Sequence, residues 1–251
     1  MSVALELNGL CKHFSGIEIL KGVTTSIPRG QVTALIGSNG AGKSTLLNIV
    51  SGLIRPNAGT IFLHGVDITA TSAHQRARAG LLRTFQHPRS FRSLTVVESV
   101  MLAARLPEEE TLVGNLLRTF KSRDSDAAEG IARRVLALCR LEGRAEIRAS
   151  ELSYGEQKLL MLAQTLAADG KLMCFDELCA GLEEGVVDHI AHQFRELADE
   201  GQTILFIEHN LRLVRQLADR VVFLHMGKVF REGSTDHVLR DPDVVQLYLG
   251  K

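Results

Sequence analysis

The 251-residue sequence has no net charge, because 29 Lys and Arg residues balance 29 Asp and Glu residues. Such a chain has no overall attraction for nucleic acid or for an anionic membrane, so we expect no nucleic-acid partner. Apolar runs as long as the roughly 18 residues of a membrane-spanning helix are absent. The N-terminus lacks a basic stretch leading into an apolar one, which argues against a secretory signal.

Cysteine is scarce, and none of its four copies forms the C-x-x-C spacing of a zinc or redox site. A chain of this length does not need disulfides to stabilise its core, so we expect reduced thiols in a cytosolic protein. His189 and His192 beside Asp188 have the spacing of a metal-ligand pair on a helix. No third ligand is evident nearby, so a solvated helix face explains this spacing better.

One glycine-rich stretch carries the strongest functional signal in the sequence. It has the pattern G-x-x-x-x-G-K-S and comprises Gly37, Ser38, Asn39, Gly40, Ala41, Gly42, Lys43, Ser44 and Thr45. The run 31–36 before it, with apolar Val32, Ala34, Leu35 and Ile36, predicts a buried strand, and residues 45–50 after it predict a helix packed on a sheet. A phosphate-binding loop occurs in this strand, loop and helix context.

The residue types in this stretch suit polyphosphate binding. Backbone N–H groups can surround phosphates only where Cβ atoms do not intrude, which explains the glycines. The following helix directs its positive end at the phosphates. Lys43 can reach the β- and γ-phosphates, and the hydroxyl of Ser44 can bind Mg²⁺.

The remaining segments predict a mixed α/β protein with one domain over residues 1–251. Apolar runs and turn residues indicate antiparallel strands within 3–36, a hairpin around Met226 and Gly227, and strands at 60–64, 81–86, 172–175 and 203–207. Between 87 and 157 the apolar spacing becomes helical. We therefore expect a helical lobe inserted into a core formed by residues 1–86 and 158–251.

Helical periodicity places helices at 96–106, 111–120, 158–168 and 184–200. Asp126 and Glu129 have the spacing of a capping box for one further helix. The apolar stripe expected on that helix comprises Ile131, Val135 and Leu138.

Polar residues follow several of the predicted strands. Asp176 and Glu177 end one strand, and beside a phosphate loop Asp176 fits a Mg²⁺ ligand and Glu177 a base that polarises the attacking water. Gln86 is either a solvated residue or one whose amide ligates Mg²⁺ or orients water at the phosphate site. His209 either donates a hydrogen bond to the γ-phosphate or caps the next helix.

For two other sites, the residues alone leave two alternative roles. Ser153 and Glu156 have capping-box spacing, so Ser153 is the expected N-cap. With Gly155 leaving the backbone accessible, this helix start either binds a second phosphate group or only caps the helix. Phe14 either stacks on a nucleotide base or belongs to the core.

Taken together, these elements resemble the ATP-binding subunits of ABC transporters along nearly the whole chain. The resemblance is carried, in order, by residues 37–45, Gln86, residues 152–157, Asp176-Glu177 and His209. It implies a P-loop NTPase (RecA-like) α/β core with an antiparallel β subdomain and an inserted α-helical lobe. It also implies ATP and Mg²⁺ as cofactors.

The resemblance also assigns roles to single residues. It makes Glu177, His209 and Lys43 catalytic, and it makes Phe14 the aromatic that stacks on adenine. Metal binding falls to Ser44, Gln86 and Asp176. Ser153, Gly155 and Gln157 match the signature that contacts nucleotide bound by a partner chain.

Within the family, similarity is greatest to the ATP-binding subunits of branched-chain (hydrophobic) amino-acid importers. It is carried by residues 84–87, 91–92, 94–96, 106–123, 242–244 and 248–250. Importers of urea or short amides share much of this pattern. Leu178 stands where the family usually has Pro, and Glu183 stands where Asp or Asn is common.

This resemblance implies an ATPase that energises import of such solutes through separate membrane subunits. Its partners would be transmembrane permease subunits, a second identical or paralogous ATP-binding subunit and, indirectly, a periplasmic or extracellular solute-binding protein. It would sit peripherally on the cytoplasmic face of the cell membrane. The alternatives are a soluble ABC ATPase acting as an assembly clamp and a nucleotide-binding module that does not hydrolyse ATP.

Overall fold

The computed structural model describes residues 2–84, 93–104 and 123–249. The chain divides into two compact units, one formed by Met1–Arg83 with Lys171–Lys251 and the other by Thr84–Gly170. The sequence-based division fell instead after residues 86 and 157. In the structure, the helix that begins at Tyr154 therefore lies entirely within the second unit.

The first unit is built on a six-stranded sheet with strand order β10-β9-β3-β8-β7-β6. Its parallel strands are β3 (Val32–Gly37), β6 (Leu81–Arg83), β7 (Leu172–Asp176), β8 (Thr203–Ile207) and β9 (Arg220–His225). β10 (Lys228–Ser234) pairs with β9 in an antiparallel hairpin, as predicted. Every residue of β3, β7 and β8 is buried, as expected for a parallel sheet covered on both faces.

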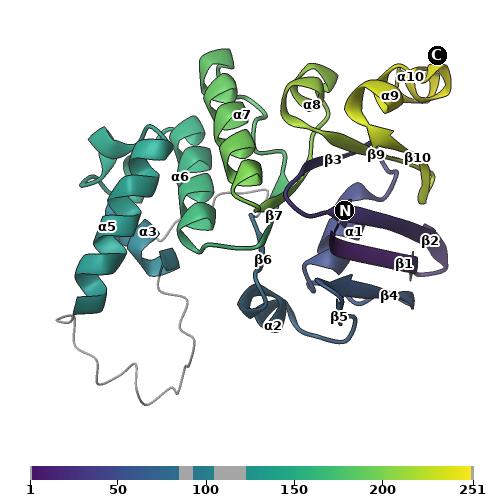
Figure 1. Ribbon diagram of the computed structural model, residues 1–251, viewed down its shortest axis with the longest axis horizontal. Helices are drawn as coiled ribbons and strands as arrows, with labels where there is room; N and C mark the ends of the chain where they lie inside the picture. Colours follow the sequence, from purple (N-terminus) through teal and green to yellow (C-terminus); the bar gives the residue numbers. More distant parts are fainter. Residues whose placement is uncertain (1, 85–92, 105–122, 250–251) are drawn as a thin grey trace. The chain divides into compact units, whose positions relative to one another are not determined.

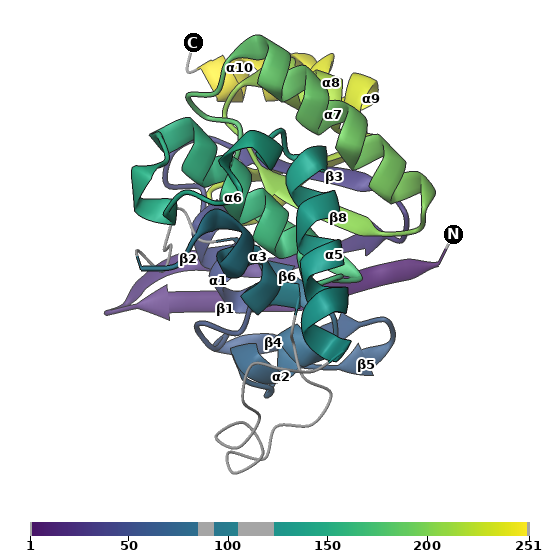
Figure 2. The same cartoon turned by 90° about the vertical axis from the view of Figure 1, so that its left-hand side faces the viewer.

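A second, antiparallel sheet has strand order β2-β1-β4-β5. Its strands are β1 (Val3–Phe14), β2 (Ile17–Pro28), β4 (Ala58–Leu63) and β5 (Val66–Asp67). The helix α1 (Lys43–Val50) lies between the two sheets (Figures 1 and 2). Leu46, Leu47, Ile49 and Val50 of α1 join one apolar core with residues of both sheets. The predicted antiparallel β subdomain is thereby confirmed.

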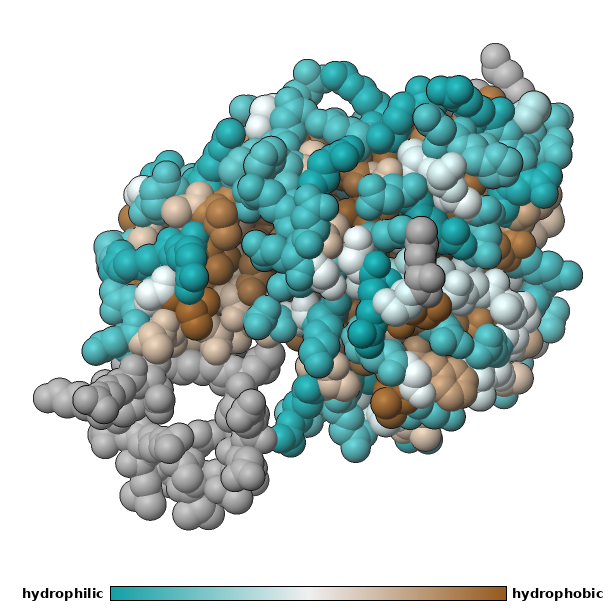
Figure 3. All heavy atoms as spheres, viewed as in Figure 1, coloured by the Kyte–Doolittle hydropathy of each residue, from teal (hydrophilic) through white to brown (hydrophobic). Residues whose placement is uncertain are grey.

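Four helices cover the opposite face of the six-stranded sheet, and their outer surface is mainly hydrophilic (Figures 1 and 3). They are α7 (Glu184–Asp199), α8 (Leu211–Leu217), α9 (Thr235–Leu239) and α10 (Pro242–Leu249). Phe194 of α7 stacks on Phe175 of β7, with ring centroids 5.1 Å apart. The short helix α2 (Ala73–Arg78) precedes β6.

The second unit contains α3 (Val96–Ala104), α5 (Arg123–Leu138) and α6 (Tyr154–Ala167), with two short 3₁₀ turns, η1 (Glu142–Arg144) and η2 (Ala149–Glu151). α3 packs against α5 and α6. The helix predicted at 111–120 lies outside the described residues. Among those described, no helix combines the length and apolar character needed to cross a membrane.

Two expectations for α5 are wrong. The helix begins at Arg123, so Asp126 lies inside it and cannot form the predicted capping box with Glu129. Glu129 instead pairs with Arg133 one turn later, at 2.8 Å. The predicted apolar stripe is wrong at Leu138, which is 37% exposed, whereas Val135 is buried as expected. Other buried residues of the helix are Ala128, Ala132 and Leu136, and the buried Cys139 follows its last residue.

Candidate functional site

The loop between β3 and α1 can be built only with glycine at two of its positions. A Cβ at Gly37 would lie 2.1 Å from the carbonyl oxygen of Leu224. Gly42 has a φ of +101°, and a Cβ there would lie 2.7 Å from Cδ2 of Leu20. Gly42 is also the N-cap of α1 and has no side-chain cap, so the first N–H groups of the helix suit an anion.

Lys43 begins α1 and its side chain is held inside the loop. Its Nζ donates hydrogen bonds to the carbonyl oxygens of Gly37, at 2.7 Å, and Ser38, at 3.0 Å. The residue is only 6% exposed. Burial lowers the pKa of Lys43, and the carboxylates of Glu177 and Asp176 oppose this shift. The site therefore contains a preplaced amine close to two acidic groups.

The loop, Glu177 and His209 line one cavity of about 360 Å³. Its remaining lining residue is Ile19 of β2, and residues 39–45 contribute the loop. Phe14 is 45% exposed and pairs in register with Ile17, two residues before Ile19, but it is not among the residues that line this cavity. Lys12 Nζ lies 5.0 Å from the centre of the Phe14 ring. Phe14 is therefore not a core residue.

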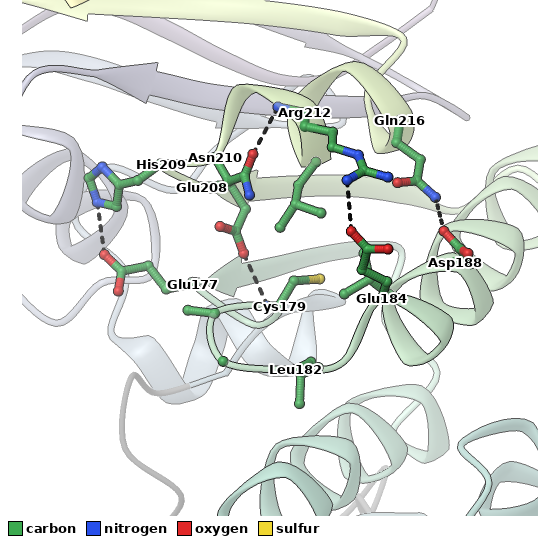
Figure 4. Close-up of a pocket in the computed structure, with 14 residues that line it drawn as sticks. Glu177, Cys179, Leu182, Glu184, Asp188, Glu208, His209, Asn210, Arg212 and Gln216 are labelled. Atoms are coloured by element: carbon green, nitrogen blue, oxygen red, sulfur yellow. Dashed lines mark hydrogen bonds and ion pairs between the residues drawn. The ribbon is translucent and has the colours of Figure 1, made fainter. Parts of the chain in front are cut away.

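Glu177 and His209 face each other from the ends of β7 and β8. The Nε2 atom of His209 lies 2.9 Å from Oε1 of Glu177. Figure 4 shows the two side chains pointing toward one another at the edge of a second cavity, of about 270 Å³. Asn210, not His209, caps α8 by accepting a hydrogen bond from the N–H of Arg212. From α10, the hydroxyl of Tyr248 donates to the carbonyl oxygen of His209.

Asp176 ends β7 and is buried beside Arg83. The Nη2 atom of Arg83 lies 3.2 Å from Oδ2 of Asp176, while its Nη1 contacts Asn48 and Ser51 of the α1 region. Burial raises the pKa of Asp176, and Arg83 opposes this shift. Neither Arg83 nor Ile19 was expected at the site from the sequence. An arginine inside a predicted buried strand is the signal that could have identified Arg83.

The oxygen donors of Ser44 and Asp176 fit Mg²⁺, which prefers hard oxygen ligands. Mg²⁺ is usually held by one or two carboxylates together with substrate phosphates and water, so it needs no dedicated cage. The described residues contain no cluster of three or more His, Cys, Asp or Glu side chains placed to hold a metal. Gln86, the third expected ligand, lies outside the described residues.

The expected signature lies in the second unit at the start of α6. Ser153 is the N-cap, and Ser153 and Glu156 form the predicted capping box. The Nε2 atom of Gln157 donates to the carbonyl oxygen of Leu152 at 2.9 Å. Backbone and hydroxyl contacts of Ser153 lower the pKa of Glu156. The N-cap role of Ser153 is confirmed, and a nucleotide role for Ser153, Gly155 and Gln157 stays a prediction.

Comparison with known proteins links this geometry to one family. The ABC transporter family model matches residues 20–180. The chain is 34% identical to the probable branched-chain amino acid transport ATP-binding protein LivG of Archaeoglobus fulgidus, over 98% of this chain and 95% of that protein. It is 33% identical to the high-affinity LivG protein of Escherichia coli strain K12, over 98% of both chains.

A solved structure has the same fold. The ADP conformation of MJ1267, an ATP-binding cassette of an ABC transporter, superimposes with a TM-score of 0.85 at 30% identity over the full length of both chains. A nucleotide-free cassette from an ABC transporter gives a TM-score of 0.84 at 30% identity, covering 99% of this chain and 100% of that one.

Proposed function

The chain belongs to the ABC transporter family of ATP-hydrolysing cassettes, and we propose that it energises import of branched-chain or other hydrophobic amino acids. The observation that carries the ATPase mechanism is that residues 39–45, Glu177 and His209 line the same cavity. The solute assignment is supported by relatives named as branched-chain amino acid transport ATP-binding proteins.

In the proposed mechanism, the loop N–H groups and Lys43 bind the phosphates of ATP. Ser44 and Asp176 would hold Mg²⁺, which neutralises phosphate charge when bound. The carboxylate of Glu177 accepts a proton from water as the water oxygen bonds to the γ-phosphorus. The bond from that phosphorus to the β–γ bridging oxygen breaks, which gives ADP and phosphate. His209, 2.9 Å from Glu177, orients that carboxylate and can donate to the γ-phosphate.

We further propose that all 251 residues form one cassette and that two such chains share each ATP. Ser153, Gly155 and Gln157 of one chain would contact nucleotide bound at Lys43 of the other. The helix start at Ser153 supports this, because its N–H groups and accessible glycine suit an anion. Phe14 would stack on the adenine ring, since it is an exposed aromatic on the hairpin whose second strand contributes Ile19 to the cavity.

The proposed setting is the cytoplasmic face of the cell membrane, where the chain would bind transmembrane permease subunits. A periplasmic or extracellular solute-binding protein would deliver the solute to those subunits. The experiment is mass spectrometry of the detergent-extracted complex, followed by solute uptake in proteoliposomes. We expect permease subunits in the complex and uptake of leucine that is lost with Glu177→Gln. Purification without any membrane subunit would contradict the proposal, and uptake of urea but not leucine would correct the solute.

The shared site has its own test. Lys43→Ala and Gly155→Asp should each be nearly inactive alone, because the first removes the loop cation and the second places a carboxylate where phosphate approaches. In a mixed dimer one interface carries both changes and the other carries neither. Mixing the two purified variants should therefore restore measurable ATPase activity. Mixed dimers seen by native mass spectrometry but lacking activity would contradict two independent shared sites.

A further inference from the structure

The backbone at Glu177 adopts a conformation that needs support from its surroundings. Its φ is +52°, in the left-handed region that is costly for a residue with a Cβ atom. Such a residue persists only where neighbouring contacts hold it in place. Residues 177–181 form the turn that follows β7, and Leu178 and Cys179 in this turn are each 3% exposed.

The end of β8 supplies two backbone contacts to this turn. The N–H of Glu177 donates to the carbonyl oxygen of Ile207 at 3.0 Å. The N–H of Cys179 donates to Oε1 of Glu208, also at 3.0 Å. Figure 4 shows the side chain of Glu208 reaching from the end of β8 to the backbone at Cys179. Glu208 is itself only 3% exposed.

The Glu208 contact is suited to hold the turn firmly. The acceptor is an oxygen of a buried carboxyl group, and burial removes the water that would compete for the N–H of Cys179. The next residue, His209, contacts the carboxylate of Glu177 at 2.9 Å. Two adjacent residues that follow β8 therefore hold the backbone of the turn and the side chain of Glu177.

We propose that Glu208 is a positioning residue that fixes the turn after β7 and so orients the Glu177 carboxylate in the phosphate cavity. The expected effect of Glu208 on kcat rests on the proposed role of Glu177 as the base. The hydrogen bond from Cys179 to Glu208 that fixes the turn does not depend on that role. The two parts can therefore be tested separately.

The kinetic test compares two substitutions of Glu208 in the full chain. Glu208→Asp keeps the carboxyl group but is one methylene too short to reach the N–H of Cys179, whereas Glu208→Gln keeps the reach and an accepting oxygen. We expect the Asp variant to lose roughly 10- to 100-fold in kcat with little change in KM for ATP. We expect the Gln variant to stay within about threefold of wild type, because its amide oxygen still accepts the bond. A Gln variant impaired as severely as the Asp variant would overturn the proposal.

Labelling of the Cys179 thiol measures how firmly the turn is held. Cys11, the only partly exposed cysteine among the four free ones, is replaced by Ser, and labelling of Cys179 is followed by mass spectrometry. In the Asp variant Cys179 should react roughly 10- to 100-fold faster than in the parent. Cys139 and Cys174 serve as folding controls, since burial raises the pKa of each to about 12. Unchanged labelling of Cys179 would overturn the proposal.

The combined results separate the two claims. Faster labelling of Cys179 with unchanged kcat would overturn the positioning role, provided that Glu177→Gln abolishes turnover. Normal turnover by Glu177→Gln would refute the proposed base, while the labelling would still judge the contact at Cys179. If labelling of Cys174 shows that the Asp variant is unfolded, amide hydrogen exchange of the wild type tests whether the contact holds the turn. The Cys179 amide should be protected as strongly as those of β7 and β8, and fast exchange would overturn the proposal.

Discussion

Breaking the contact between Arg83 and Asp176 should cost far more stability than breaking an exposed ion pair of shorter length. The Arg83 and Asp176 side chains are 8% and 4% exposed, with 3.2 Å between Nη2 and Oδ2. Arg83→Met keeps a long apolar stem but leaves a buried carboxylate without this partner. Removing one partner of a buried pair costs about 3 to 5 kcal/mol. That is a large share of the roughly 5 to 15 kcal/mol that stabilises a typical domain.

The matched control is Arg133→Met. Arg133 pairs with Glu129 at 2.8 Å and with Glu146 at 2.9 Å, so its contacts are shorter than that of Arg83. Its side chain is 51% exposed, however, and solvent screens such pairs. The comparison therefore separates the effect of burial from that of distance.

Urea unfolding at pH 7 without nucleotide or Mg²⁺ measures both effects. The chain has no Trp and two Tyr residues, so in a Tyr154→Phe background the fluorescence of Tyr248 follows the unit that contains Arg83. We expect Arg83→Met to lower the midpoint by roughly 1 M or more. Arg133→Met, followed by circular dichroism, should leave the midpoint almost unchanged. An equal loss in the two variants, or none with Arg83→Met, would refute the reasoning.

Three further predictions concern the phosphate loop, the start of α6 and the contact to His209. Lys43→Ala should abolish binding of a fluorescent ATP analogue, because it removes the cation held in the loop, and binding near wild-type affinity would contradict the site. Because the pKa of Glu156 is lowered in the folded chain, its stabilisation is present above its ordinary pKa and is lost as pH falls through the lowered value. Glu156→Gln should therefore destabilise the protein at pH 7 and much less near pH 3 in urea titrations, and a loss independent of pH would argue against this cause. Tyr248→Phe removes the hydroxyl that donates to His209, so kcat should fall about three- to tenfold with KM for ATP unchanged, whereas an equal change in KM would indicate a role in binding.

Local patterns in the sequence predicted much of this fold. The fully buried strands β7 and β8 were found because continuous apolar runs mark parallel strands covered on both faces. The capping box at Ser153 was found because its partners are only three residues apart. The same pattern failed at Asp126, where the helix simply continues toward the N-terminus. Capping-box spacing marks the start of a helix only where the residues before it are not helical.

Contacts between residues far apart in the chain could not be predicted from the sequence. Arg83 and Asp176 are 93 residues apart, and Cys179 and Glu208 are 29 apart, so no local period links them. Glu208 was recognised only as the residue before His209. Side-chain reach, burial and strand order decide such contacts, and these follow from the packed sheet. The phosphate loop, in contrast, could be predicted from the sequence because its chemistry resides in consecutive residues.

The most direct test of the proposed mechanism is a paired measurement on Glu177→Gln. The substitution removes the proton-accepting carboxylate while leaving the loop, Lys43 and the Cβ position intact. We expect ATP to bind with near wild-type affinity, and phosphate release to fall by about 10²- to 10⁴-fold, the usual contribution of a general base. Phosphate release at the wild-type rate, with ATP bound equally well, would show that Glu177 is not the base and would contradict the mechanism.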